Sequence, residues 1–87
     1  MNVTAVESST LATVAYDEIH ELLQLEFRSR AVYQYFRVPA KVHEALLNAP
    51  SKGGYFNQEI RGKFLYGQVD DSQAKASDQM IPIRSRR

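Results

Sequence analysis

Alternation of apolar and polar residues within positions 22–28 constrains the fold of this chain more than any other feature of its sequence. Leu23, Leu25 and Phe27 fall on one side of the segment if it is extended, and the residues between them are polar. A helix would spread these three apolar side chains around its surface. The pattern therefore predicts a strand with one buried face.

Strands are also predicted on both sides of this segment. Residues 11–16 read LATVAY, and β-branched and aromatic residues of this kind favour extended structure. Residues 31–38 read AVYQYFRV, in which Tyr33, Tyr35 and Arg37 share one face and the residues between them share the other. Because the connections are short and polar, the three strands are expected to form an antiparallel meander.

Two short helices are predicted to follow the sheet. Pro39 suits the first position of a helix, and an apolar stripe at helical spacing follows it, formed by Val42, Ala45, Leu46 and Ala49. Pro50 ends this helix, and Ser51 is expected to cap the next one. The second helix is predicted over residues 55–65, and three apolar residues recur there every four positions, namely Phe56, Ile60 and Phe64.

A chain of 87 residues allows one small domain. The predicted fold class is α+β, a three-stranded antiparallel β-meander followed by two short helices packed on one face. Residues 1–10 are predicted to be a flexible N-terminal lead-in, and the domain is predicted over residues 11–66. Residues 67–87 show no periodic apolar face and are predicted to be a flexible polar tail, with a basic end formed by Arg84, Arg86 and Arg87.

The residue content argues against several kinds of chemistry. Cysteine is absent, so neither a disulfide nor a thiolate is available. The two histidines, His20 and His43, have no partner at zinc-ligand spacing, and Ser8 and Ser9 have no sequence sign of an activating base. We therefore expect a non-enzymatic protein with no cofactor and no metal.

Charge and hydropathy bear on the partners. The net charge of +1 neither requires nor excludes a nucleic acid. No apolar run approaches the roughly 18 residues of a membrane helix, and the first ten residues lack the pattern of a signal peptide. We therefore expect no membrane contact and a cytoplasmic location, in a bacterial or phage-type setting.

A resemblance to a known family rests on motifs whose order and spacing agree along residues 8–66. The downstream motifs are Tyr33-Gln34-Tyr35, Val38-Pro39, Ser51-x-Gly53 and Phe56-Asn57-x-x-Ile60-Arg61. The upstream motifs are Ser8-Ser9, Tyr16 and Leu25-x-Phe27. Together they make the chain similar to the KTSC family, small bacterial domains that are also found at the C-terminus of some lysyl-tRNA synthetases.

The resemblance implies a function only by association, because RNA binding is suggested by the synthetase fusions and no site is identified. One position departs from the family's pattern. Arg30 occupies a turn that often carries glycine in this family, and a left-handed conformation there is harder for arginine.

Two strand tyrosines are candidates for RNA recognition. Tyr33 and Tyr35 are two residues apart, so they can form a platform on which unpaired bases stack. The alternative is that both lie beneath the helices as part of the core, with their hydroxyls hydrogen-bonded at its rim.

The connection before the second helix supplies the polar candidates. Gly53 lets the backbone approach a ligand closely, Lys52 stands beside it, and N–H groups at a helix start attract anions. Asn57 and Arg61 complete the set as donors to a base or a phosphate. Each has a structural alternative: a tight turn at Gly53, a side chain that ties this turn together at Asn57, and a salt bridge between helices at Arg61.

These residues predict a small binding module. RNA, either transfer RNA or single-stranded RNA, is the first candidate partner. The alternative is a protein-interaction module or a homodimer, because a three-stranded sheet leaves two edges to which another strand can add.

Overall fold

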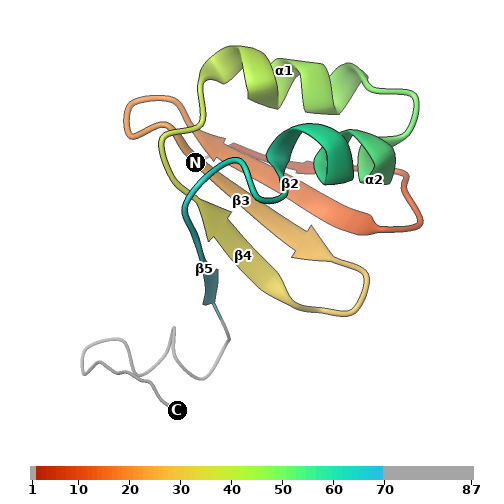
Figure 1. Cartoon of the computed structure of the whole chain (residues 1–87). Helices are drawn as coiled ribbons and strands as arrows, with labels where there is room; N and C mark the ends of the chain where they lie inside the picture. The colour runs from red at the N-terminus through yellow and green to blue at the C-terminus, as the bar shows by residue number, and fades with distance from the viewer. Residues whose placement is uncertain (1, 70–87) are drawn as a thin grey trace.

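A computed structural model describes residues 2–69 and contains one five-stranded antiparallel sheet with a helical layer on one face (Figure 1). The strands lie side by side in chain order as β1 (Asn2–Ala5), β2 (Leu11–Asp17), β3 (Leu22–Phe27), β4 (Val32–Tyr35) and β5 (Tyr66–Val69). The helical layer consists of α1 (Ala40–Asn48) and α2 (Lys52–Tyr55), which continues into the π-helical turn η1 (Phe56–Ile60). Over residues 2–69, no helix is long and apolar enough to cross a membrane.

The predicted meander corresponds to β2, β3 and β4, but the prediction of only three strands was wrong. β1 lies in the segment predicted as a flexible lead-in, and it pairs with β2 so that Val3 is opposite Ala15. β5 pairs with β4 so that Tyr66 is opposite Tyr35. Both strands are four residues long and lie at the sheet edges, so hydrogen bonding to the neighbouring strand defines them more than an apolar pattern of their own.

The predicted flexible tail is only partly described. Residues 67–69 belong to β5 and are therefore part of the sheet. The rest of that segment, with its three terminal arginines, lies outside the described residues.

Two element boundaries also differ from the prediction. β4 ends at Tyr35 rather than at residue 38, because the chain bends at Arg37, whose φ is 60°. The second helical segment spans residues 52–60 instead of 55–65. It ends before Gly62, whose φ of 77° is the left-handed conformation common after a helix.

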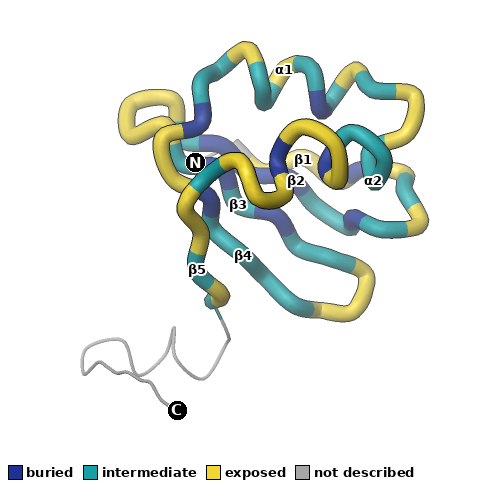
Figure 2. The backbone as a smooth tube through the Cα atoms, viewed as in Figure 1, coloured by how far each residue is buried: buried dark blue, intermediate teal, exposed yellow. Residues whose placement is uncertain are grey.

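The core lies between the sheet and the helices (Figure 2). The alternation in β3 is confirmed, since Leu23 and Leu25 are fully buried and Phe27 packs against the same cluster. Leu46 of α1 and Ile60 of η1 belong to this cluster and are also fully buried. Full burial of such a side chain contributes about 1.5–3 kcal/mol, so these contacts hold the helical layer on the sheet.

Tyr16 and His43 join β2 to α1 at the other end of the core. Their rings are stacked with centroids 4.5 Å apart, and the Tyr16 hydroxyl donates a hydrogen bond to the carbonyl oxygen of Val38. Burial lowers the pKa of His43 below its ordinary value, and Glu44 partly opposes this shift. His43 is therefore held as a neutral packing partner of the tyrosine.

The turn between β3 and β4 places a non-glycine residue in a left-handed conformation. Arg30 has a φ of 79°, and its N–H donates a hydrogen bond to the carbonyl oxygen of Phe27 at 2.9 Å. This is the conformation that glycine adopts more readily than arginine. The hairpin therefore forms despite an unfavourable residue at this position.

Candidate nucleic-acid interface

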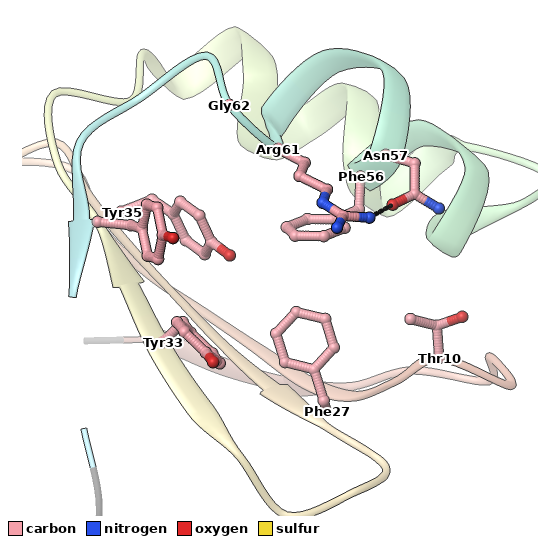
Figure 3. Close-up of a pocket in the computed structure, with 9 residues that line it drawn as sticks. Thr10, Phe27, Tyr33, Tyr35, Phe56, Asn57, Arg61 and Gly62 are labelled. Atoms are coloured by element: carbon pink, nitrogen blue, oxygen red, sulfur yellow. Dashed lines mark hydrogen bonds between the residues drawn. The ribbon is translucent and has the colours of Figure 1, made fainter. Parts of the chain in front are cut away.

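A cleft of about 540 Å³ lies between the sheet and the helix that runs from α2 into η1 (Figure 3). Five aromatic side chains line it, those of Phe27, Tyr33, Tyr35, Phe56 and Tyr66. The other lining residues are Thr10, Asn57, Arg61 and Gly62. We call this space the aromatic cleft. Of the described residues, no aspartate or glutamate lines it.

The strand register explains why the tyrosines converge. Tyr35 is opposite Tyr66 across the β4–β5 pair, and Tyr33 precedes Tyr35 by two residues, so all three side chains lie on the helical side of the sheet. The Tyr35 and Tyr66 rings are stacked, with centroids 5.6 Å apart and 27° between their planes. Phe27 and Phe56 meet edge to face at 5.3 Å and bring the sheet and the helix together.

Tyr33 and Tyr35 differ in their burial, so each fits one of the two interpretations that the sequence left open, a stacking platform or a core position. Tyr35 is only 4% exposed and belongs to the core, whereas Tyr33 is half-buried at the margin of that core. Burial and the neighbouring Tyr33 and Tyr66 raise the pKa of Tyr35 to about 12, and Arg61 acts in the opposite direction. Tyr35 is therefore a neutral ring that supports the cleft, and Tyr33 presents the more accessible ring.

Asn57 and Arg61 form the polar side of the cleft (Figure 3). Arg61 Nη1 donates a hydrogen bond to Asn57 Oδ1 at 3.4 Å, and both residues are exposed. Within residues 2–69 the only salt bridge joins Asp17 to His20. The alternative in which Arg61 forms a salt bridge between the helices is therefore wrong. The guanidinium group is accessible to an anionic ligand beside the aromatic rings.

Lys52 and Gly53 lie outside the aromatic cleft. Lys52 Nζ donates a hydrogen bond to the carbonyl oxygen of Ala49 at 2.9 Å, so this ammonium group is engaged at the end of α1. A Cβ atom on Gly53 would lie 2.5 Å from Thr10 Oγ1. Glycine is therefore needed here because α2 packs closely against the segment before β2.

A second, polar hollow of about 410 Å³ adjoins the aromatic cleft. Its lining residues are Glu7, Ser8, Ser9, Thr10, Pro50, Ser51, Lys52, Gly53, Gly54 and Asn57. Four of these residues carry hydroxyl groups, and we call this space the hydroxyl hollow. Thr10 and Asn57 line both spaces, so the cleft and the hollow are adjacent.

Two of these hydroxyls are held by the backbone. Ser8 Oγ accepts hydrogen bonds from the N–H groups of Thr10 and Leu11, at 3.0 and 3.1 Å. Ser51 Oγ accepts one from the Gly54 N–H at 3.1 Å, which confirms the predicted cap of the second helix. The N–H group of Gly54 is thereby already used within the protein.

Sequence reasoning did not single out Phe27, Phe56 or Tyr66 as site residues. The two phenylalanines lie on the predicted apolar faces, but an apolar face marks a core and a cleft alike. Tyr66 joins the cleft through strand pairing, for which the sequence carried no signal. Arg28 is close in sequence to Phe27, yet its guanidinium donates hydrogen bonds at 2.9 and 3.2 Å to carbonyl oxygens of the β1–β2 connection.

The fold and the cleft together define a small α+β domain with a ligand-sized opening between its sheet and its helices. The family model for the KTSC domain matches residues 7–64, and the chain belongs to this family. This match indicates no catalytic family. The resemblance based on the tyrosine, serine–glycine and phenylalanine–asparagine motifs is therefore confirmed.

Known relatives place the same domain in different proteins. A crystal structure of a KTSC domain protein from Yersinia pestis is similar with a TM-score of 0.77 and 35% identity, covering 79% of this chain and 97% of that one. A lysine–tRNA ligase from Nostoc punctiforme is 46% identical over 63 residues, which is 72% of this chain and 11% of the ligase. An uncharacterized protein from Stutzerimonas stutzeri is 39% identical over 71 residues, covering 80% of this chain and 100% of that protein. The chain thus spans a small part of the ligase.

Proposed function

We propose that this KTSC domain is a non-enzymatic module that binds unpaired RNA by stacking a base in the aromatic cleft. The observation that carries the proposal is that five aromatic rings and the Arg61 guanidinium surround one opening. A planar base matches the rings, and its phosphate matches the guanidinium. A nucleotide therefore satisfies both the apolar and the charged parts of the cleft.

The size of the cleft supports an unpaired base rather than a duplex. A volume of about 540 Å³ is in the range of small-ligand sites. Bases within a duplex are stacked on their neighbours, whereas bases in loops and ends can be splayed out onto aromatic side chains. The relatives support an RNA partner independently, because several of them are named lysine–tRNA ligases.

The first test removes one wall of the cleft. Tyr66 is 59% exposed, so Tyr66→Ala is expected to leave the fold intact. Loss of one stacking contact, about 1–3 kcal/mol, weakens binding about 5- to 150-fold. Fluorescence anisotropy with a labelled single-stranded RNA at low salt measures this change.

Leu65→Ala is the matched control for this test. Leu65 precedes Tyr66, is 77% exposed, and does not line the cleft, so its removal should leave the affinity unchanged. Equal affinities of the two variants would refute stacking in the cleft. Absence of binding by the wild-type protein at low salt would refute RNA binding altogether.

The second test identifies the phosphate contact. If Arg61 neutralises one phosphate of a single strand, Arg61→Ala reduces the slope of log K against log salt by about 0.7. Lys63→Ala is the control, since Lys63 is exposed but lies outside the cleft. Lys52→Ala should also leave the slope unchanged, because Lys52 does not line the cleft and its ammonium group is directed at the Ala49 carbonyl oxygen. An unaltered slope in Arg61→Ala would remove Arg61 as the contact.

A second candidate function is protein interaction through β5. Tyr66, the first residue of this strand, is 59% exposed, Leu65 just before it is 77% exposed, and the nearby Phe36 is 41% exposed. Phe36 and Leu65 are joined by a backbone hydrogen bond of 2.9 Å, so the three side chains come from one region of the sheet edge. Apolar edges of this kind accept an added strand. Sedimentation across a dilution series tests self-association, and a monomer at all concentrations would exclude the homodimer.

A further inference from the structure

We infer that the hydroxyl hollow receives the ribose next to the stacked base and recognises its 2′-hydroxyl, so that the domain prefers RNA to DNA. This inference rests on the proposed function, because it assumes that a base occupies the aromatic cleft. It adds the part of the nucleotide that the second space would hold.

Adjacency of the two spaces is the first support. Thr10 and Asn57 line both the cleft and the hollow, so the hollow is the space next to a base bound in the cleft. Thr10 lies close to the start of α2, because Gly53 of this helix has no Cβ to separate the two segments. We place the sugar next to the stacked base in this neighbouring space.

The hydrogen-bonding groups of the hollow suit a hydroxyl ligand. Ser8 Oγ accepts two backbone N–H groups, so its own proton is the group left to bond a ligand. The Ser51 hydroxyl likewise accepts a backbone N–H and has a proton to donate. Glu7 lines the same space and, when ionised, only accepts hydrogen bonds. A ribose 2′-hydroxyl both donates and accepts, so it matches this mixed set.

The charges of the hollow argue against a phosphate there. The Glu7 carboxylate would repel it and offsets the positive charge of Lys52, whose ammonium group also donates a hydrogen bond to the Ala49 carbonyl oxygen. In the aromatic cleft the charged lining residue is Arg61. The phosphate is therefore assigned to Arg61 and the sugar to the hollow.

The test compares three labelled single strands of one sequence with the wild-type domain at fixed salt: RNA, DNA and 2′-O-methyl RNA. If one hydrogen bond forms to the 2′-hydroxyl, the dissociation constant should be roughly 3- to 10-fold lower for RNA than for DNA. The 2′-O-methyl strand lacks the donor that Glu7 would bind, so its affinity should approach that of DNA.

The variant Glu7→Ala assigns the preference to the hollow. Removing a negative charge strengthens binding of every nucleic acid, so the ratio of RNA to DNA affinity is the readout. That ratio should fall toward one in Glu7→Ala and stay unchanged in Glu18→Ala, since Glu18 is an exposed carboxylate that does not line the hollow.

The possible results separate this inference from the proposed function. Equal wild-type binding of RNA and DNA, weakened by Tyr66→Ala, would overturn recognition of the ribose and leave base stacking in place. A preference for RNA that Glu7→Ala does not change would also overturn the assignment to the hollow. Failure to bind any of the three strands would overturn the proposed function itself.

Discussion

The substitution Gly53→Ala tests how closely α2 approaches the segment before β2. The added Cβ would lie 2.5 Å from Thr10 Oγ1 and 3.1 Å from Thr10 Cβ, which is closer than ordinary van der Waals contact. The main chain of Thr10 cannot move away freely, because its carbonyl oxygen accepts the Arg28 N–H at 2.9 Å and its own N–H donates to Ser8 Oγ. Rotation of the side chain would remove Oγ1 but leave Thr10 Cβ at 3.1 Å from the added atom. The contact must therefore be relieved by strain.

Two opposing effects decide the magnitude. Overpacking of this kind costs about 1–3 kcal/mol, whereas alanine is favoured over glycine in a helix by about 1 kcal/mol. Gly53→Ala is therefore expected to lower the free energy of unfolding by up to about 2 kcal/mol. Thr10→Ala removes the nearest atom, so Gly53→Ala in that background should be close to neutral or stabilising, with a coupling energy of about 1–2 kcal/mol.

Urea unfolding followed by circular dichroism measures the free energy of unfolding of the wild type, the two single variants and the double variant. An unchanged m-value shows that all four expose the same amount of surface on unfolding. Gly67→Ala is the control, since a Cβ at that position meets no atom within 4 Å. A Gly53→Ala variant at least as stable as the wild type, with no coupling to Thr10, would refute the close approach of the helix.

Three further predictions concern stability. Arg30→Gly should raise the free energy of unfolding by up to about 1 kcal/mol, because the φ of 79° is strained for arginine; urea unfolding checks this, and a loss of stability would contradict it. Phe56→Ala should cost about 3–5 kcal/mol because Phe56 is buried. Phe27→Ala should lower the free energy of unfolding by less than Phe56→Ala, because Phe27 is half-buried. Equal shifts of the urea midpoint in the two variants would contradict the difference in burial. Burial in the folded state lowers the pKa of His43 below 6.5, so the folded state binds fewer protons than the unfolded chain. The stability that comes from packing His43 as a neutral ring is therefore present above about pH 6.5 and is lost as the pH falls. The melting temperature should therefore drop from pH 7.5 to 5.5, and His43→Phe should flatten that drop; an identical slope in the variant would assign it to other groups.

The central elements of the fold were predictable because their periodicity is a local property of the chain. Alternation in β3 marked Leu23 and Leu25 as one buried face, and both are buried. Helical spacing likewise placed Leu46 on the inner side of α1, and the cap at Ser51 formed as expected. Four-residue edge strands are too short to show a period, so β1 and β5 were missed.

The candidate site was predictable only in part. Tyr33, Tyr35, Asn57 and Arg61 do line one cleft, while Lys52 and Gly53 line the adjacent hollow. A sequence shows that a residue is charged or aromatic, but it does not show which hydrogen bond that residue already makes. Lys52 and Arg28 remain cations in the folded protein, but each donates hydrogen bonds to backbone carbonyl oxygens.

The sequence by itself determined the α+β class, the family, the absence of thiol chemistry and which side chains share a face, because these depend on residue type and short-range spacing. Only the tertiary structure decided that Tyr66 closes the cleft beside Tyr33 and Tyr35, and that Thr10 meets the backbone of Gly53. These contacts join segments far apart in the chain. Their geometry depends on strand register and on helix packing against the sheet, and the free energy that selects both comes from burying the whole core at once.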